Sequence, residues 1–309
     1  MQRGQVTRRS VVKIAVGSAA AVNFSASQCA AAAADIKPTI ASGELAMPKV
    51  DVGRGVAIAY KDDWFGPPWE TGEPIVLIHG VAESHVAWQQ WMPILAPKLR
   101  VLRPDVPGFG QSPVPAGYNW TTAGLAESLI RFADALKVDR FHLAGAKFGG
   151  SIAMQLAIDA PDRIKSLAVF GSIAQAKADQ KKGPDLIRAI GVHGWALKTE
   201  AGRLGSDAPP AMVRWWTDEF MGKADPRACI GCASAQADLD LMPQLGGIKA
   251  PTLVVTSEQT PRPPLSEVRA YQERIPRSRL LALPGNFYHV AAIRPEECAR
   301  AVLQLIASV

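Results

Sequence analysis

The chain has 309 residues and a formal net charge of +6; 48% of its residues are hydrophobic and 20% are charged. This composition suits one large domain with an insertion, and it supplies enough apolar residues for a core. Four of the positive charges, on Arg3, Arg8, Arg9 and Lys13, precede the first acidic residue, Asp35. The remainder is only mildly basic and has no basic patch with interleaved aromatic residues, which argues against nucleic acid as a partner.

The N-terminus has the features of an export signal. Residues 7–13, Thr-Arg-Arg-Ser-Val-Val-Lys, resemble a twin-arginine motif, and a moderately apolar run over residues 14–24 follows them. Small residues at 32–34 offer a cleavage site. The run is too short and too rich in alanine for a stable membrane span. We therefore predict a signal peptide over residues 1–34 and a periplasmic or secreted mature protein; a disordered basic tail is the alternative.

From residue 35 the hydrophobic pattern alternates between strands and helices. After a loose lead-in, residues 55–60 suit an edge hairpin, and the apolar run at 75–78 is typical of a parallel strand buried on both faces. Further strands are predicted at 101–106, 139–144, 164–170, 251–256 and 279–284, and helices at 88–99, 121–136, 151–160, 265–275 and 296–307. This alternation predicts a mostly parallel α/β sheet with helices on both faces.

The alternation stops between residues 172 and 247, where the pattern indicates helices and no strong strand. Trp195, Trp215 and Trp216 lie in this stretch. Clustered tryptophans in a helical lid suit an apolar or aromatic ligand, and a purely structural role is the equal alternative.

The same stretch contains a single C-x-x-C pair, Cys229 and Cys232. A single pair with no second pair argues against a zinc site. We expect two buried free cysteines, and a local disulfide in an oxidising compartment is the alternative. We expect no metal and no organic cofactor.

Residues 145–150, Gly-Ala-Lys-Phe-Gly-Gly, lie between a predicted strand and a predicted helix. A strand, a glycine-flanked tight turn and a helix form the context of the nucleophile elbow, G-x-S-x-G. Lys147 stands where that motif has its serine. The turn therefore predicts a fold clearly but lacks the usual nucleophile.

Several segments together make the chain resemble an α/β-hydrolase-fold protein with a cap. They are the elbow, His79-Gly80 at a strand end, the turn from Asp105 to Ser112, the Pro251 strand, and the segment from Pro284 to His289. The resemblance covers essentially the whole mature chain. It implies a core formed by residues 35–171 and 248–309, and a helical cap formed by residues 172–247.

The resemblance also implies roles for individual residues. The backbone N–H groups of Val81 and Phe148 match the family's oxyanion hole, and His289 matches its catalytic histidine. The position of the usual carboxylate aligns with Thr260, so Glu258 is the nearest candidate for the partner of His289.

Substrate contacts are predicted for Glu83 and Ser84, near the oxyanion loop, and for the three cap tryptophans, Trp195, Trp215 and Trp216. Ser84 is equally compatible with a surface position. The substrate is expected to be a small molecule with apolar or aromatic parts.

Lys147 leaves three alternatives, because an acyl-lysine amide would not turn over readily. In the favoured one, a neutral amine attacks a ketone or aldehyde to form a Schiff base, and His289 moves protons for carbon–carbon cleavage or decarboxylation. The N-terminus of the following helix and a capped apolar pocket both favour the neutral amine.

In the second alternative Lys147 stays charged, with Glu83 as its partner, and stabilises a substrate anion while His289 activates water for hydrolysis of an ester or a carbon–carbon bond. In the third, the pocket binds a ligand without turning it over. The sequence identifies neither the substrate nor the reaction.

Overall fold

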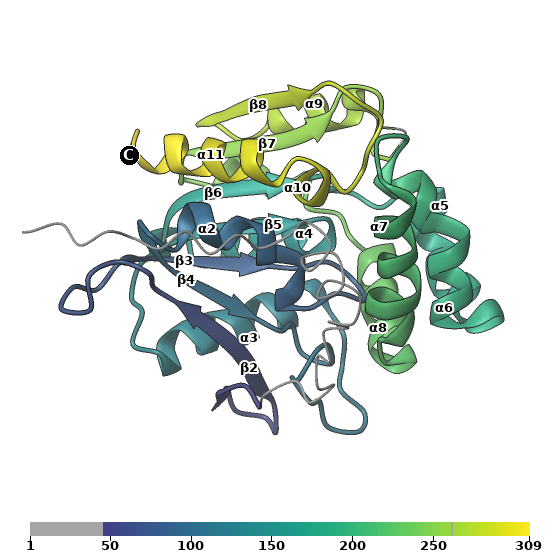
Figure 1. Cartoon of the computed structure of the whole chain (residues 1–309), viewed down its shortest axis with the longest axis horizontal. Helices are drawn as coiled ribbons and strands as arrows, with labels where there is room; N and C mark the ends of the chain where they lie inside the picture. The colour runs from purple at the N-terminus through teal and green to yellow at the C-terminus, as the bar shows by residue number, and fades with distance from the viewer. Residues whose placement is uncertain (1–45, 261) are drawn as a thin grey trace, which may run out of the picture. The chain divides into compact units, whose positions relative to one another are not determined.

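The computed structural model describes residues 46–260 and 262–309 (Figure 1). The predicted signal peptide lies outside this part of the chain. Eight strands form one sheet in the order β1-β2-β4-β3-β5-β6-β7-β8. The strands are β1 (Lys49–Asp51), β2 (Ala57–Asp63), β3 (Glu73–Ile78), β4 (Leu99–Pro104), β5 (Phe141–Ala146), β6 (Ile164–Phe170), β7 (Thr252–Ser257) and β8 (Ser278–Leu283).

Strand β2 is antiparallel to both β1 and β4, and every later pair in the sheet is parallel. The predicted α/β architecture and its edge hairpin are therefore confirmed. The short strand β1 was not predicted, because the expected loose lead-in, residues 35–49, overlaps it only at Lys49. It forms because residues 49–51 pair with Ala57–Ala59 on the neighbouring strand.

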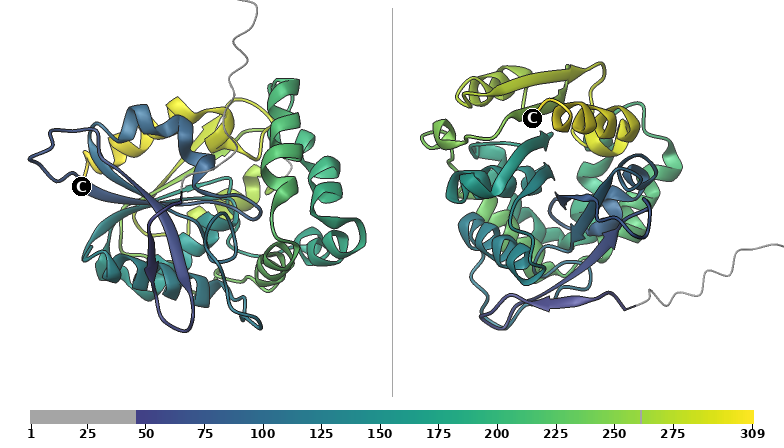
Figure 2. Two further views of the ribbon diagram at one scale, coloured as in Figure 1. Left: turned by 60° about the horizontal axis from the view of Figure 1, so that its bottom comes forward. Right: turned by 90° about the vertical axis from the view of Figure 1, so that its left-hand side faces the viewer.

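Helices cover both faces of the sheet, as Figure 2 shows in its edge-on view. They are η1 (His85–Trp91), α2 (Met92–Leu95), α3 (Thr122–Ala135), α4 (Phe148–Asp159), η2 (Pro161–Arg163), α9 (Leu265–Gln272), α10 (Val290–Ile293) and α11 (Pro295–Ile306). Helices α3 and α4 pack together on one face, and α2 and α11 pack together on the other.

Strand β3 illustrates why the sheet is buried on both sides. Val76 and Ile78 belong to one hydrophobic cluster, whereas Ile75 and Leu77 belong to the other. All four side chains are at most 1% exposed. Each such side chain contributes about 1.5–3 kcal/mol when it is fully buried, so a continuous apolar run is what this position requires.

One predicted helix, residues 88–99, was wrong in its extent. The chain forms the 3-10 helix η1 and then the short α2, which ends at Leu95 before β4 begins at Leu99. Pro93 lies in the first turn of α2. Proline has no N–H to donate and clashes with the preceding turn, so it starts a new helix here instead of continuing the previous one.

Residues 172–247 contain helical segments and, among the described residues, no strand beyond an isolated bridge between Gln175 and Asp240. The segments are α5 (Ala178–Lys181), α6 (Gly183–Leu204), α7 (Pro210–Arg214), η3 (Trp215–Phe220), η4 (Met221–Lys223), α8 (Pro226–Ala237) and η5 (Leu245–Gly247). Figure 1 shows α5 to α8 at the end of the sheet toward which the parallel strands point.

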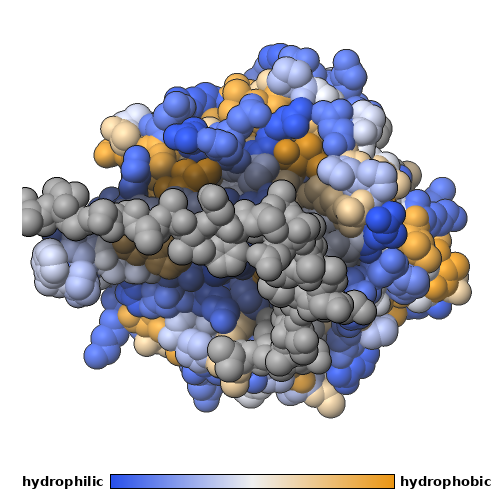
Figure 3. All heavy atoms as spheres, viewed as in Figure 1, coloured by the Kyte–Doolittle hydropathy of each residue, from blue (hydrophilic) through white to orange (hydrophobic). Residues whose placement is uncertain are grey.

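Helix α6 is kinked at Gly191, whose φ of 73° and ψ of 170° lie outside the helical region. Figure 3 shows hydrophobic as well as hydrophilic residues on the outer surface of this end of the molecule. Helix α6 contributes exposed side chains of Ile190 and Leu197.

Cys229 and Cys232, in α8, are buried free thiols. No helix in the described part of the chain is both long enough and apolar enough to cross a bilayer.

Candidate active site

Lys147 lies in the sharp turn between β5 and α4. Its φ of 57° and ψ of −123° are strained for a residue with a side chain. The N–H of Lys147 donates a hydrogen bond of 2.8 Å to the carbonyl oxygen of Phe170, which connects the turn to the end of β6. A Cβ at Gly149 would lie 2.3 Å from the carbonyl oxygens of Ile78 and His79, so only glycine allows α4 to approach β3 this closely. The elbow geometry persists with lysine in place of serine.

The ammonium group of Lys147 pairs with the carboxylate of Glu83, and both residues are buried. The second carboxylate oxygen of Glu83 accepts a hydrogen bond of 3.0 Å from the N–H of Gly80. Nζ of Lys147 also lies 3.3 Å from Nδ1 of His289 and 4.8 Å from the centre of the Trp216 ring. One amine is thus held by an anion, an imidazole and an aromatic face.

His289 presents one ring nitrogen to each of two partners. When Lys147 donates to Nδ1, the proton of the neutral imidazole is on Nε2, which lies 3.2 Å from a carboxylate oxygen of Glu200. These two atoms are not aligned as a hydrogen bond. Burial lowers the pKa of His289 well below its ordinary value, and the positive charges of Lys147 and Arg203 lower it further. The imidazole is therefore neutral at neutral pH.

Glu200 comes from α6 in the cap, and sequence reasoning missed it. Its side chain is fully buried, and it accepts a hydrogen bond of 2.9 Å from the Arg203 guanidinium. Burial raises the pKa of Glu200 above its ordinary value, and the charges of Arg203 and Lys147 only partly offset that rise. An acid at the predicted position would have come from the loop after β7. The structure instead places a cap carboxylate beside His289.

The segment carrying His289 is attached to the end of α6. The N–H groups of Tyr288 and His289 both donate to the carbonyl oxygen of Arg203, at 2.7 and 3.1 Å. Asn286 accepts a hydrogen bond of 3.0 Å from the N–H of Ser206. The end of α6 therefore fixes the loop that places the His289 ring beside Lys147.

A cavity of about 500 Å³ opens over Lys147. Val81, Phe148, Glu83, Trp195 and His289, all of them predicted site residues, are among the residues that line it. Phe148 is the first residue of α4, and the first N–H groups of a helix have no partner within the helix. This N–H is therefore free to donate to an anion, and its role in an oxyanion hole stays a prediction.

Other predicted site residues lie elsewhere. Glu258 is exposed at the end of β7, and its N–H donates to the carbonyl oxygen of Leu283. Ser84 caps η1 by accepting from the N–H of Val86, and Trp215 is 40% exposed on the cap. None of Glu258, Ser84 and Trp215 is among the residues that line the cavity in the described structure.

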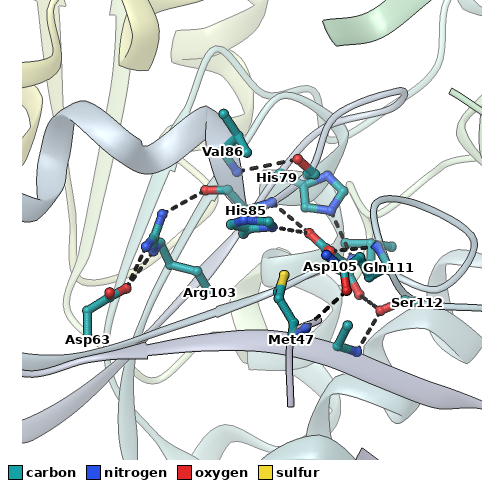
Figure 4. A network of polar contacts seen from close by, with 12 residues as sticks. Met47, Asp63, His79, His85, Val86, Arg103, Asp105, Gln111 and Ser112 are labelled. Carbon is teal, nitrogen blue, oxygen red and sulfur yellow. Dashed lines mark hydrogen bonds and ion pairs between the residues drawn. The ribbon is translucent and has the colours of Figure 1, made fainter. Parts of the chain in front are cut away.

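A buried network of polar contacts links His79 and His85, in the loop after β3, to the turn after β4 (Figure 4). Val81 and Glu83 lie between these two histidines in the sequence. Nε2 of His79 accepts from the N–H of Val106 at 2.9 Å, so Nδ1 donates to the carbonyl oxygen of Gly80 at 2.8 Å. One oxygen of Asp105 accepts from the backbone N–H of His85 at 2.7 Å and from its ring at 2.9 Å.

Burial alone would raise the pKa of Asp105, but the hydrogen bond from His85 and the nearby histidine charges hold it below its ordinary value. Asp105 therefore remains an anion that ties two loops together. Among residues 46–260 and 262–309, no group of three His, Cys, Asp or Glu side chains is arranged to hold a metal ion.

Comparisons with known proteins agree with this fold. The alpha/beta hydrolase fold family matches residues 73–293. The 2-hydroxy-6-oxo-2,4-heptadienoate hydrolase of Pseudomonas putida is 36% identical over 105 residues, which are 33% of this chain and 38% of that protein. The chain thus spans well under half the length of that relative.

The putative carbamate hydrolase RutD of Variovorax paradoxus is 29% identical over 203 residues, covering 60% of this chain and 73% of that protein. Among solved structures, a hydrolase from Pseudomonas aeruginosa has a TM-score of 0.76 and 25% identity, covering 85% of this chain and 99% of that one. The sheet, the elbow turn and the matched residues lead to one conclusion: the chain belongs to the α/β hydrolase fold family.

Proposed function

We propose that this hydrolase-fold protein is an enzyme that acts on a small carbonyl compound through the amine of Lys147. One observation carries the proposal: Nζ of Lys147 faces a cavity and contacts both the Glu83 carboxylate and the His289 imidazole. A nucleophilic amine needs such neighbours, because its proton must leave before attack and return afterwards. A relative whose name specifies an oxo compound as its substrate supports a carbonyl ligand.

The Lys147–Glu83 pair gives the amine a short path for its proton. The side chains of Lys147 and Glu83 are 10% and 1% exposed, and Nζ contacts one oxygen of the carboxylate. A general base must lie within hydrogen-bond reach of the proton that it removes. Glu83 is therefore placed to accept a proton from Lys147 and to return it.

The proposed reaction balances with these residues alone. The lone pair of Nζ attacks the carbonyl carbon, the oxygen takes protons returned by Glu83, and water leaves to give an iminium ion. The bond between the carbon atoms α and β to the iminium carbon then breaks, and its electrons move into the iminium to form an enamine. The β carbon leaves as carbon dioxide when it was a carboxylate, or as an aldehyde when it carried a hydroxyl group whose proton the neutral His289 imidazole takes. Carbon protonation and addition of water then release the ketone and restore Lys147.

His289 suits proton transfer on the amine better than activation of a separate water molecule. Its lone pair is on Nδ1, which faces Lys147, and its other nitrogen faces Glu200. A general base must reach the proton that it removes. In the observed arrangement, the proton within reach of the His289 lone pair is on Lys147.

A second function is favoured by the contacts of the ammonium form. The Glu83 carboxylate and the Trp216 ring both stabilise a cation at Nζ. A permanent ammonium would stabilise an anion formed during hydrolysis of an ester or carbon–carbon bond, with the N–H groups of Val81 and Phe148 assisting. This alternative needs the charge of Lys147 but not its nucleophilicity.

Borohydride trapping tests the proposal. Wild-type protein is incubated with a panel of ketones and aldehydes, reduced, digested and analysed by mass spectrometry. We expect a reduced adduct on the peptide that contains Lys147, and none on that peptide in Lys147→Arg. The same arginine variant tests the alternative, because arginine keeps the charge and loses the nucleophile.

Two results would contradict the Schiff base. One is wild-type turnover of a carbonyl substrate with no trapped adduct. The other is an arginine variant that keeps a substantial part of that turnover. Binding of the panel compounds with neither turnover nor a trapped adduct would show that the pocket binds ligands without catalysis.

A further inference from the structure

The cavity over Lys147 has an unequal charge lining. Five cationic side chains border it, and Glu83 is the one carboxylate among its lining residues in the described structure. The cationic residues are Lys147, Lys182, Lys198, Arg203 and Arg262. A concave site lined by one sign of charge raises the local concentration of ligands of the opposite sign.

The inner cations already have partners. Lys147 pairs with Glu83, and Arg203 pairs with Glu200 while lying 4.5 Å over the Trp195 ring. These charges are compensated within the protein before any ligand arrives. A negatively charged ligand group is therefore not needed to balance the cations in the inner part of the cavity.

Two outer cations are not compensated in this way. Lys182 and Lys198 are exposed, and neither forms an ion pair with any residue in the described ranges. Lys182 directly precedes α6, whereas Lys198 lies in α6 beyond the kink at Gly191, so the two lysines are on opposite sides of that kink along the chain. Both nevertheless border the same cavity. The kink thus places two unpaired ammonium groups at the mouth of one site.

Apolar side chains line the cavity along with these charges. Ile187, Trp195 and Met221 contribute to its lining and are at most 6% exposed. A ligand that fills the site is therefore charged where it leaves the cavity and apolar along its length. The polar group at the other end of such a ligand is then the one that lies at Lys147.

We infer that the substrate is an anionic oxo acid, with its carboxylate beside Lys182 and Lys198, an apolar segment next to Trp195, and its ketone at Lys147. The position of the ketone rests on the proposed function, whereas the position of the carboxylate rests on the two mouth lysines alone. A carboxylate separated from the ketone by several carbon atoms fits better than a 2-oxo acid, because mouth and elbow are distinct parts of the cavity.

Straight-chain methyl ketone acids, from 4-oxopentanoate to 7-oxooctanoate, test this inference against their neutral carboxamides. Binding is followed by quenching of tryptophan fluorescence at low salt. We expect the best acid to bind about tenfold more tightly than its amide. The Lys182→Gln/Lys198→Gln variant should reduce this preference to about twofold, with the amide affinity unchanged. The matched control, Lys49→Gln/Lys98→Gln, removes two exposed charges that do not line the cavity.

Equal affinity for acid and amide across the series would overturn the inference, and so would an undiminished preference in the double variant at the mouth. The control must keep the preference; its loss would mean that net charge, and not these two lysines, selects the acid. Borohydride trapping of the same ligands separates the two proposals. Tighter binding of the acid without any trapped adduct would support the carboxylate site and contradict the Schiff base. Equal trapping of acid and amide would support the Schiff base and contradict the carboxylate site.

Discussion

The pair formed by Lys147 and Glu83 dominates the site at the scale of single residues. Both side chains are buried at the junction of β3, β5 and α4, and Glu83 also accepts from the backbone of Gly80. A buried charge that loses its partner destabilises a fold strongly, whereas replacing both charges by neutral groups is often tolerated. Reactivity and stability are therefore linked at this one pair.

This link gives the first prediction. Lys147→Met should destabilise the protein by about 3–5 kcal/mol, because it leaves Glu83 buried without its cation. Adding Glu83→Gln should recover most of that loss. Urea unfolding of the two single variants and the double variant measures the coupling. Additive losses would mean that the two side chains do not form a buried ion pair in solution.

The second prediction concerns serine chemistry. Fluorophosphonates label an activated hydroxyl next to a base, and the elbow presents an amine. Ser151, the nearest serine in α4, is fully buried and donates to the carbonyl oxygen of Ile173. We therefore expect wild-type protein and Lys147→Ala to show the same background labelling. Stoichiometric labelling of any serine that borders the cavity would identify a different nucleophile.

At the scale of elements, the cap supplies more of the site than the sequence indicated. The elbow turn and His289 could be found because each follows a strand with a recognisable pattern. Glu200 could not, because it is 89 positions before His289 in a helix whose periodicity carries no sign of a partner. Only the hydrogen bonds between the end of α6 and the His289 loop bring the two together.

The third prediction distinguishes two cap tryptophans by their positions relative to the cavity. Trp195 lines the cavity, whereas Trp215 is 40% exposed and stacks on Phe220. Ligand binding should change the fluorescence of wild-type protein. Trp195→Phe should remove much of this response, and the matched control Trp215→Phe should keep it. A response that depends on Trp215 instead would place the ligand outside the cavity.

At the scale of the whole molecule, the sheet could be predicted almost completely. Runs of apolar residues such as 75–78 and 167–170 require burial on both faces, and that requirement fixes parallel strands covered by helices. The boundaries near Pro93 and the short strand β1 could not be predicted, because local proline geometry and pairing with a neighbour determine them. The same packing determines which titratable side chains are buried, and these buried groups determine how stability changes as the pH falls.

The fourth prediction is that stability falls as the pH decreases below about 6.5. Burial lowers the pKa values of His79, His142 and His289 in the folded protein. The unfolded chain therefore binds protons at these sites before the folded chain does. The stability that they contribute is complete above about pH 6.5 and is lost as the pH falls, by up to about 1.4 kcal/mol per pH unit for each histidine.

Glu200 works in the opposite direction. Burial raises its pKa in the folded protein, so in the pH range just above the ordinary pKa of glutamate the folded chain keeps a proton that the unfolded chain releases. Urea unfolding between about pH 8 and about pH 5 should therefore give a shallower decline for His289→Gln than for wild type, and a steeper one for Glu200→Gln. Identical slopes in all three proteins would show that neither buried group changes its proton affinity on folding. With the predicted pattern, the site would have a neutral imidazole, whose lone pair on Nδ1 can accept a proton from Lys147, beside a carboxyl group that resists ionisation.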